Sequence, residues 1–171
     1  LGDLAGATAA HTAVAAAAAA AGDTAAIGIA AANLGNVATA EQRFDVALGH
    51  YATAEAALRE VATLGALLPV LANRAQIHHM HQRFPDALCD YTEAAQIAHR
   101  AGNLGAAGQW AQPAIQLAYQ LGDTNRAEPL WAVLADVARA SGDAAGLQRA
   151  LGERALMLID RAQPAGAAGD P

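Results

Sequence analysis

Three histidines lie within four residues in the stretch IHHMHQRF, Ile77 to Phe84, although the chain has only six histidines. Imidazole groups bind metal ions and transfer protons near neutral pH, so these are the two kinds of chemistry that such a cluster offers. Successive residues of a helix turn by about 100 degrees, so His78 and His81 lie on one side and His79 points away from both. The three side chains therefore cannot bind a single ion. A metal site made by His78 and His81 with Glu41 remains one alternative.

The other candidates for catalysis are isolated residues. The single serine, Ser141, lies in the turn ASGDA, without the glycine pattern of a nucleophile elbow. Cys89 precedes Asp90, whose carboxylate disfavours a thiolate, so we expect a structural cysteine. The glycines of GNLGAAG, residues 102–108, follow no strand and do not form a phosphate-binding fingerprint. Asp86 and Asp90 share one helical face, where we expect a solvated pair. We therefore expect no enzyme and no cofactor.

Composition argues against several classes of partner. The formal net charge is -6, and the ten basic residues are all arginine. Nucleic acids and anionic lipids bind clustered basic side chains, so we expect no nucleic acid and no membrane. The alanine-rich stretch VAAAAAAAGD, residues 14–23, has no basic segment before it, and we expect a soluble helix rather than a signal peptide or a span. The single cysteine fits a reducing compartment. The absence of lysine suggests a GC-rich genome, and we expect a bacterial, cytoplasmic protein.

The elements that position these residues follow a repeat of forty residues. The segment from Asn33, NLGNVATAEQRFDVALGHYATA, aligns with the segment from Asn73, NRAQIHHMHQRFPDALCDYTEA. Identical residues stand forty apart in these pairs: Asn33 and Asn73, Gln42 and Gln82, Arg43 and Arg83, Phe44 and Phe84, Ala47 and Ala87, Leu48 and Leu88, Tyr51 and Tyr91, Ala54 and Ala94. The turns at Gly22, Gly102 and Gly142 keep the same step, and Gly2 and Gly122 belong to a second turn series. Two turn series in each repeat predict two helices in each repeat.

Local signals agree with this division. Gly22, Gly102 and Gly142 are typical of the left-handed residue that ends a helix, and the Asp or Asn after each suits the N-cap of the next helix. We expect helices near residues 4–21, 24–41, 44–61, 65–81, 85–101, 104–121, 124–140 and 144–162. They form one domain, 1–162, with a half repeat 1–22, repeats 23–62, 63–102 and 103–142, and a half repeat 143–162. The tail, 163–171, is expected to be disordered. Because the chain starts without methionine in mid-repeat, we expect a piece of a longer protein.

The run Asn33-Leu34-Gly35-Asn36, followed by Phe44, Ala47, Tyr51 and Ala54, resembles the tetratricopeptide repeat. The usual period is shorter, and a step of forty is similar to the long-repeat type of kinesin light chain and of the Leu-Gly-Asn repeat regulators. Pro113 in place of the leading Asn and Leu134 in place of the closing Ala depart from the pattern. The resemblance implies an all-α, right-handed superhelix of antiparallel helix pairs, with the first helix of each repeat on the concave face.

On that face the resemblance places mainly amides, which donate to and accept from a peptide backbone at once. We expect a protein or peptide segment to bind a groove made by these residues: Asn33, Asn36, Asn73, Gln76, His79, Gln109, Gln112, Gln116, Tyr119 and Gln120. Ile29, Ala32, Thr39, Pro69, Ala72 and Met80 would flank them. The three complete repeats offer no cation here, so an acidic C-terminal tail is not expected to bind. His79 would make binding pH-dependent.

Two other functions remain open. The amides could also be ordinary solvated residues on an empty face. A second function is a homo-oligomerising or signal-transmitting helical segment of a larger multidomain regulator. In the last helix Leu147, Leu151, Ala155 and Leu158 are expected to pack backwards, which leaves Leu156 and Ile159 on the groove side. This excess of apolar surface predicts either a following repeat or a self-association face. Metal binding through His78 and His81 is the third alternative.

Overall fold

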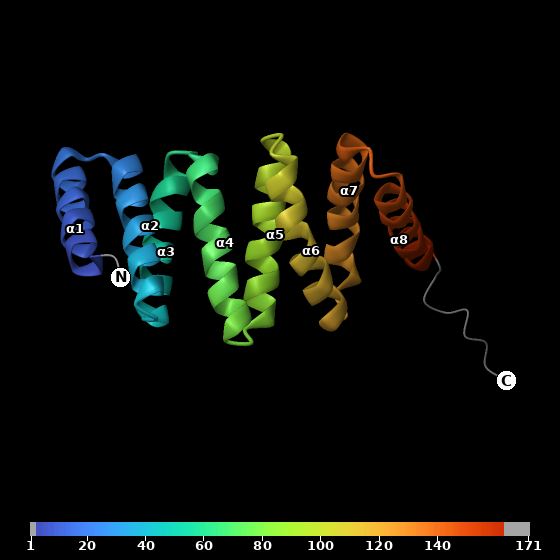
Figure 1. The fold of residues 1–171 in the computed structure, drawn as a ribbon, viewed down its shortest axis with the longest axis horizontal. Helices are drawn as coiled ribbons and strands as arrows, with labels where there is room; N and C mark the ends of the chain where they lie inside the picture. The colour runs from blue at the N-terminus through green and yellow to red at the C-terminus, as the bar shows by residue number, and fades with distance from the viewer. Residues whose placement is uncertain (1–2, 163–171) are drawn as a thin grey trace. The chain divides into compact units, whose positions relative to one another are not determined.

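The computed structural model describes residues 3–162, with side chains up to Ile159, and these residues form helices and short turns without a strand. The helices are α1 (Leu4–Ala21), α2 (Thr24–Ala40), α3 (Phe44–Glu60), α4 (Leu64–Met80), α5 (Phe84–Arg100), α6 (Leu104–Gln120), α7 (Thr124–Ser141) and α8 (Ala144–Ala162). Figure 1 shows them in chain order. Every predicted helix is found, with its ends within one residue of the predicted ones. The tail expected to be disordered, residues 163–171, lies outside the described residues.

The turns recur every twenty residues and share one backbone conformation. Positive φ angles occur at Gly22, Gly102, Gly122 and Gly142, as the glycine pattern predicts. The same conformation occurs where the chain has no glycine, at Gln42, Ala62 and Gln82, with φ of 60°, 54° and 58°. Asp23, Asn103 and Asp143 accept hydrogen bonds from backbone N–H groups three residues further on, which confirms them as N-caps. Asp3 and Asp123 cap α1 and α7 in the same way.

The chain divides into two compact units, residues 1–90 and 91–171, which are described separately. In unit 1, α1 packs on α2, α2 on α3, and α3 on α4, so that neighbouring helices run antiparallel. The contact between α2 and α3 requires small residues. A Cβ on Gly35 would lie 2.5 Å from Cε1 of Tyr51, and a Cβ on Gly28 would lie 2.8 Å from Cγ of Leu58. The aromatic ring of Tyr51 therefore fills the space that glycine leaves on α2, as the repeat pattern implies.

Unit 2 repeats this packing with different residues. It contains the second part of α5, then α6, α7 and α8; α7 packs on both α6 and α8. Alanines dominate the buried faces of α6, where Ala107, Ala111, Ala114 and Ala118 are all fully enclosed. Tyr91 of α5 stacks on Trp110 of α6, with ring centroids 5.8 Å apart. Alanine-rich contacts allow the helix axes to approach closely, and larger aliphatic side chains such as Leu117 and Leu130 are buried beside them.

Helix α1 differs from the other described helices because 12 of its 18 residues are alanine, and it packs mainly against α2. Among the described residues it is the one helix of at least 18 residues that is apolar enough to cross a membrane, and 6% of that stretch is buried. Length and apolar composition are shared by membrane spans, signal sequences and ordinary helices. The assignment of α1 to the soluble array therefore stays a prediction.

Candidate functional site

The predicted amides of unit 1 line a small pocket between α2, α3 and α4. Asn33 and Asn36 of α2 and Asn73 of α4 form its polar side. Its apolar wall consists of Ile29, Ala32, Leu58, Ala66, Pro69 and Val70. The pocket volume is about 150 Å³, which is comparable to apolar cavities that accept a benzene-sized group. The structure thus brings three of the five predicted residues of this unit together around space for one apolar side chain.

Internal hydrogen bonds orient two of these amides. The Oδ1 atom of Asn36 accepts a hydrogen bond from Oη of Tyr51 at 2.8 Å and another from Nδ2 of Asn73 at 2.8 Å. Thr39, also predicted on this face, lies with its hydroxyl 3.2 Å from Oη of Tyr51 and donates to the carbonyl of Gly35. The side-chain nitrogen of Asn36 and the side-chain oxygen of Asn73 have no hydrogen bond to any described residue. The network therefore leaves one donor and one acceptor next to the pocket.

The other predicted groove residues of unit 1 do not line this pocket. Gln76 and His79 are exposed on α4, and the ring of His79 contacts Phe84 edge to face, with centroids 5.8 Å apart. Met80 is also exposed. Ala72, expected on the same face, is buried, so that expectation is wrong. The error arises because residue 72 lies one step round the helix from Asn73, towards the packed side.

The histidines of IHHMHQRF occupy three separate environments. His78 is half-buried, with Nε2 4.0 Å from Oδ2 of Asp90, and its Nδ1 is buried without a hydrogen-bond partner among the described residues. Burial lowers the pKa of His78, against the attraction of Asp90 and Asp86. His81 ends α4 and contacts the ring of Phe44. No group of three His, Cys, Asp or Glu side chains suited to a metal occurs in the described part of the chain, so the metal alternative gains no support.

A charged cluster between α3, α4 and α5 was not anticipated. Arg74 donates from Nε and Nη2 to the two carboxylate oxygens of Asp90, at 2.8 and 2.7 Å, and from Nη1 to Glu55. Asp90 is only 6% exposed, so the expectation of a solvated Asp86 and Asp90 pair is wrong for Asp90. Burial raises the pKa of Glu55, but hydrogen bonds and charges of Arg74 and Arg59 outweigh it and lower that pKa. The hydrogen bonds to Asp90 raise the pKa of Arg74.

The position of Cys89, which neighbours Asp90, differs from the prediction. We expected a structural cysteine, whereas its side chain is exposed on α5. Ser141, the other isolated nucleophile, donates a hydrogen bond to the carbonyl of Ala138 at 3.1 Å. This hydrogen bond to a helix carbonyl places the hydroxyl at the C-terminal end of α7.

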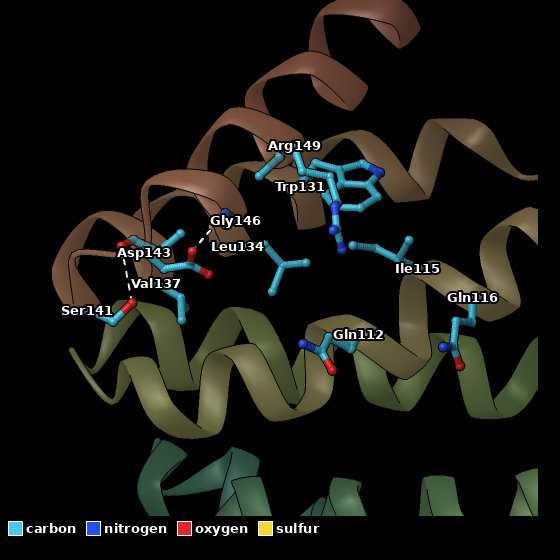
Figure 2. A pocket seen from close by; sticks show the side chains of 12 residues that line it. Gln112, Ile115, Gln116, Trp131, Leu134, Val137, Ser141, Asp143, Gly146 and Arg149 are labelled. Atoms are coloured by element: carbon cyan, nitrogen blue, oxygen red, sulfur yellow. Dashed lines mark hydrogen bonds between the residues drawn. The ribbon is translucent and has the colours of Figure 1, made fainter.

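Unit 2 contains a larger pocket between α6, α7 and α8, with a volume of about 430 Å³. Of the predicted residues, Gln112 and Gln116 of α6 line it, while Gln109 and Gln120 are exposed elsewhere on α6. Figure 2 shows the remaining lining, which includes Ile115, Trp131, Leu134, Val137, Ser141, Asp143, Gly146 and Arg149. The pocket thus combines apolar walls from α6 and α7 with one cation from α8.

Tyr119, predicted in the groove, links all three helices near this pocket. Its hydroxyl donates to Oε2 of Glu153 on α8 at 3.0 Å and accepts from Nε1 of Trp131 on α7 at 3.2 Å. Trp131 stands eighty residues after Tyr51, and Tyr119 stands eighty after Thr39. The same pair of repeat positions is therefore in contact in each unit. In both cases an aromatic residue of the second helix reaches the predicted binding face of the first helix.

Arg149 is the pocket residue that the sequence analysis missed. It stands forty residues after Gln109 and eighty after Pro69, so it belongs to a column of the predicted binding face. The predicted binding face included only the three complete repeats, and Arg149 lies in the following half repeat. Extension of the forty-residue step to α8 places Arg149 on the predicted binding face, so the sequence contained the signal for this residue.

The apolar face of α8 is also placed differently from the prediction. Ala150 and Met157 are buried against the preceding helices, whereas Leu151 and Leu158 are 44% and 45% exposed. The expectation that Leu151 and Leu158 pack backwards is therefore wrong. They stand 120 residues after Ala31 and Ala38 of α2, which lie on the side where α2 packs on α3. In α8 this is the side that a following helix would cover.

Comparisons with known proteins bear on the fold. No protein-family model matches the chain, and no curated protein matches it in sequence. A crystal structure described as BtubC (BKLC) from P. vanneervenii matches with a TM-score of 0.53 and 16% sequence identity, covering 87% of this chain and 68% of that one. At this identity the likeness concerns the fold, whereas the tetratricopeptide assignment rests on the sequence resemblance alone. The protein has an all-α helical-repeat fold.

Proposed function

We propose that the chain is a protein-interaction module whose unit 1 binds an extended peptide segment at Asn33, Asn36 and Asn73. The observation that carries this proposal is the pair of unused amide groups beside an apolar pocket. A peptide unit presents one C=O and one N–H, which match the free nitrogen of Asn36 and the free oxygen of Asn73. Asn33 has no hydrogen bond to a described residue and supplies a further donor and acceptor.

The pocket then selects for one apolar side chain of the bound segment. Ile29, Pro69 and Val70 surround it with apolar atoms, and the pocket has room for a single medium-sized group. Backbone hydrogen bonds give affinity without regard to sequence, while the pocket gives a preference at one position. The amides carry no net charge, so the proposed binding depends little on salt concentration.

A peptide selection followed by calorimetry tests this function. Random peptides are selected against the whole chain, and the dissociation constant of a selected peptide is measured with wild type, with Asn33→Ala/Asn73→Ala, and with Gln82→Ala/Gln96→Ala. Each amide hydrogen bond contributes about 0.5–1.5 kcal/mol, so the asparagine pair is expected to lose roughly tenfold or more in affinity. The glutamine pair lies outside the pocket and controls for the loss of two amides. Equal affinity of all three proteins would remove the proposal.

We propose self-association through α8 as a second function, since its exposed face matches a face that is buried in α2. Gln148, Leu151, Ala155 and Leu158 stand 120 residues after Gly28, Ala31, Gly35 and Ala38. Those α2 residues are buried at the contact with α3. A helix of a second copy would cover the apolar part of this face. Because Leu151 and Leu158 are 44% and 45% exposed, burying the rest of both side chains contributes about 1–3 kcal/mol before the cost of association.

Light scattering at several concentrations tests the second function. Wild type is expected to form dimers as concentration rises, and Leu151→Lys/Leu158→Lys is expected to stay monomeric. Val14→Lys, at an exposed apolar site on α1, is the matched control and should dimerise like wild type. A wild-type chain that remains monomeric at all concentrations excludes this function.

A further inference from the structure

The Arg74 cluster, made by Glu55, Arg74 and Asp90, joins α4 of unit 1 to both α3 and α5. Arg74 donates from Nε and Nη2 to the two carboxylate oxygens of Asp90, at 2.8 and 2.7 Å, and from Nη1 to Glu55. The side chains of Arg74 and Asp90 are only 16% and 8% exposed. One planar guanidinium therefore connects three helices in a single geometry, largely away from solvent.

The following repeat has no such cluster at the corresponding positions. Glu55, Arg74 and Asp90 each stand forty residues before an apolar residue that is fully buried: Ala95, Ala114 and Leu130. Apolar packing thus suffices there to hold the helices together. A buried ion pair is seldom more stable than well-packed apolar residues, because each charge loses its hydration. Stability alone therefore does not account for the cluster in unit 1.

The cluster acts on the helix that carries one side of the amide pocket. Asn73 precedes Arg74, and its Nδ2 donates to Oδ1 of Asn36 on α2 at 2.8 Å. Side chains end about 5–6 Å from the axis of a helix, so a rotation of α4 by about 10° moves the amide of Asn73 by about 1 Å. A shift of this size takes the two atoms beyond hydrogen-bond distance. The position of Asn73 therefore depends on the rotation of α4 about its axis.

Apolar packing defines this rotation less sharply than hydrogen bonds do. The buried side chains of α4 are aliphatic and include Leu67, Val70 and Leu71, and hydrophobic contacts have no preferred direction. The N–H groups of Arg74 instead require nearly straight bonds to oxygen atoms on two different helices. Rotation of α4 in either direction would distort these bonds.

We propose that Arg74, held by Glu55 and Asp90, is a positioning residue that fixes the rotation of α4 and so places Asn73 for peptide binding. This role rests on the proposed peptide site of unit 1. None of the three residues lines the pocket, so they act on the peptide through Asn73 and not by contact. Loss of the cluster should therefore lower peptide affinity without a matching loss of stability.

Replacement of the whole cluster by apolar residues separates these two effects. In Glu55→Ala/Arg74→Met/Asp90→Leu, two positions take the residues of the following repeat, and methionine fills the space of the arginine stem. The three charges are removed together, so none is left buried without a partner, and the melting temperature should equal or exceed that of wild type. The dissociation constant of the selected peptide should rise about three- to tenfold, as for one lost hydrogen bond.

A thermodynamic cycle tests whether the cluster acts through Asn73. Peptide affinity is also measured by calorimetry for Asn73→Ala and for Asn73→Ala combined with the apolar replacement. The combined variant should bind as Asn73→Ala does, because the cluster then has no amide to position. Arg59→Met is the matched control. Arg59 pairs with the same Glu55 but lies on α3, so this variant should bind like wild type.

Arg74→Lys is a second variant, which keeps a cation between the two carboxylates. Lysine lacks the planar fork of arginine and cannot hold Asp90 and Glu55 in the same geometry. This variant should bind the selected peptide about threefold more weakly than wild type. Because the buried carboxylates keep a cation, it tests the positioning role even if the apolar replacement does not fold.

The possible results distinguish the positioning role from the peptide site itself. Wild-type affinity of Arg74→Lys or of the folded apolar replacement overturns the positioning role alone, provided that Asn73→Ala binds weakly. Additive losses in the cycle also overturn it, since they indicate an effect that does not pass through Asn73. Wild-type affinity of Asn73→Ala removes the amide site, and the positioning role with it.

Discussion

Replacement of Ala62 by glycine should stabilise the protein, although it removes a methyl group and adds no contact. Ala62 lies in the turn that follows α3 and has a φ of 54°, in the left-handed region that costs an L-residue about 1–2 kcal/mol. Glycine adopts this conformation freely but loses about 0.5–1 kcal/mol more backbone entropy on folding. The difference is a gain of about 0.5–1 kcal/mol. Ala62 is exposed, so no packing is lost.

Thermal unfolding followed by circular dichroism measures this effect. For a chain of this length, the gain corresponds to a rise in melting temperature of roughly 1–4 °C. Ala52→Gly is the matched control, because Ala52 is exposed within α3 and glycine in a helix interior costs about 1 kcal/mol. The two identical substitutions should therefore change stability in opposite directions. A decrease for Ala62→Gly similar to that for Ala52→Gly would refute the reasoning about turn strain.

Two further predictions concern packing and pH. Gly35→Ala should lower the free energy of unfolding in urea by about 1–3 kcal/mol, because its Cβ would lie 2.5 Å from the ring of Tyr51. Gly49→Ala is the control: a Cβ there has nothing within 4 Å, so this substitution should raise the free energy of unfolding by up to about 1 kcal/mol. Glu55 has a lowered pKa next to Arg74, so its contribution to stability is present above its unfolded pKa and is lost as pH falls through the folded one. The urea midpoints of wild type and Glu55→Gln should therefore differ at neutral pH and converge in acid; a constant difference contradicts this.

The helices were predictable because several local signals agree at their ends. Glycine followed by Asp or Asn marks the turns after Ala21 and Ser141, and the forty-residue step transfers these boundaries to turns without such signals. The left-handed conformation at Gln42, Ala62 and Gln82 was not predictable from residue type. It follows from the fold, because the turn must close in the same way in every repeat whichever residue stands there.

The candidate sites were predicted less completely. Register placed Asn33, Asn36 and Asn73 on one face, but it contained no information on the hydrogen bonds that orient them. The ion pair of Arg74 and Asp90 joins two helices, and a sequence shows such a pair as two ordinary charged residues. The error at Leu151 has a different cause. Apolar residues stand both on the side of α8 that packs on the preceding helices and on its exposed side, so the sequence pattern fits either side as the buried one.

The side-chain amide signals of Asn36 and Asn73 provide the most direct measurement of the central claim. Their NH₂ resonances can be assigned with single Asn→Asp variants and followed in NMR spectra as a selected peptide is added. If the peptide backbone binds between these amides, both signals shift with the same dissociation constant that calorimetry gives, and the signal of Gln96 stays in place. Saturable peptide binding that leaves both asparagine signals unmoved would contradict the proposed site.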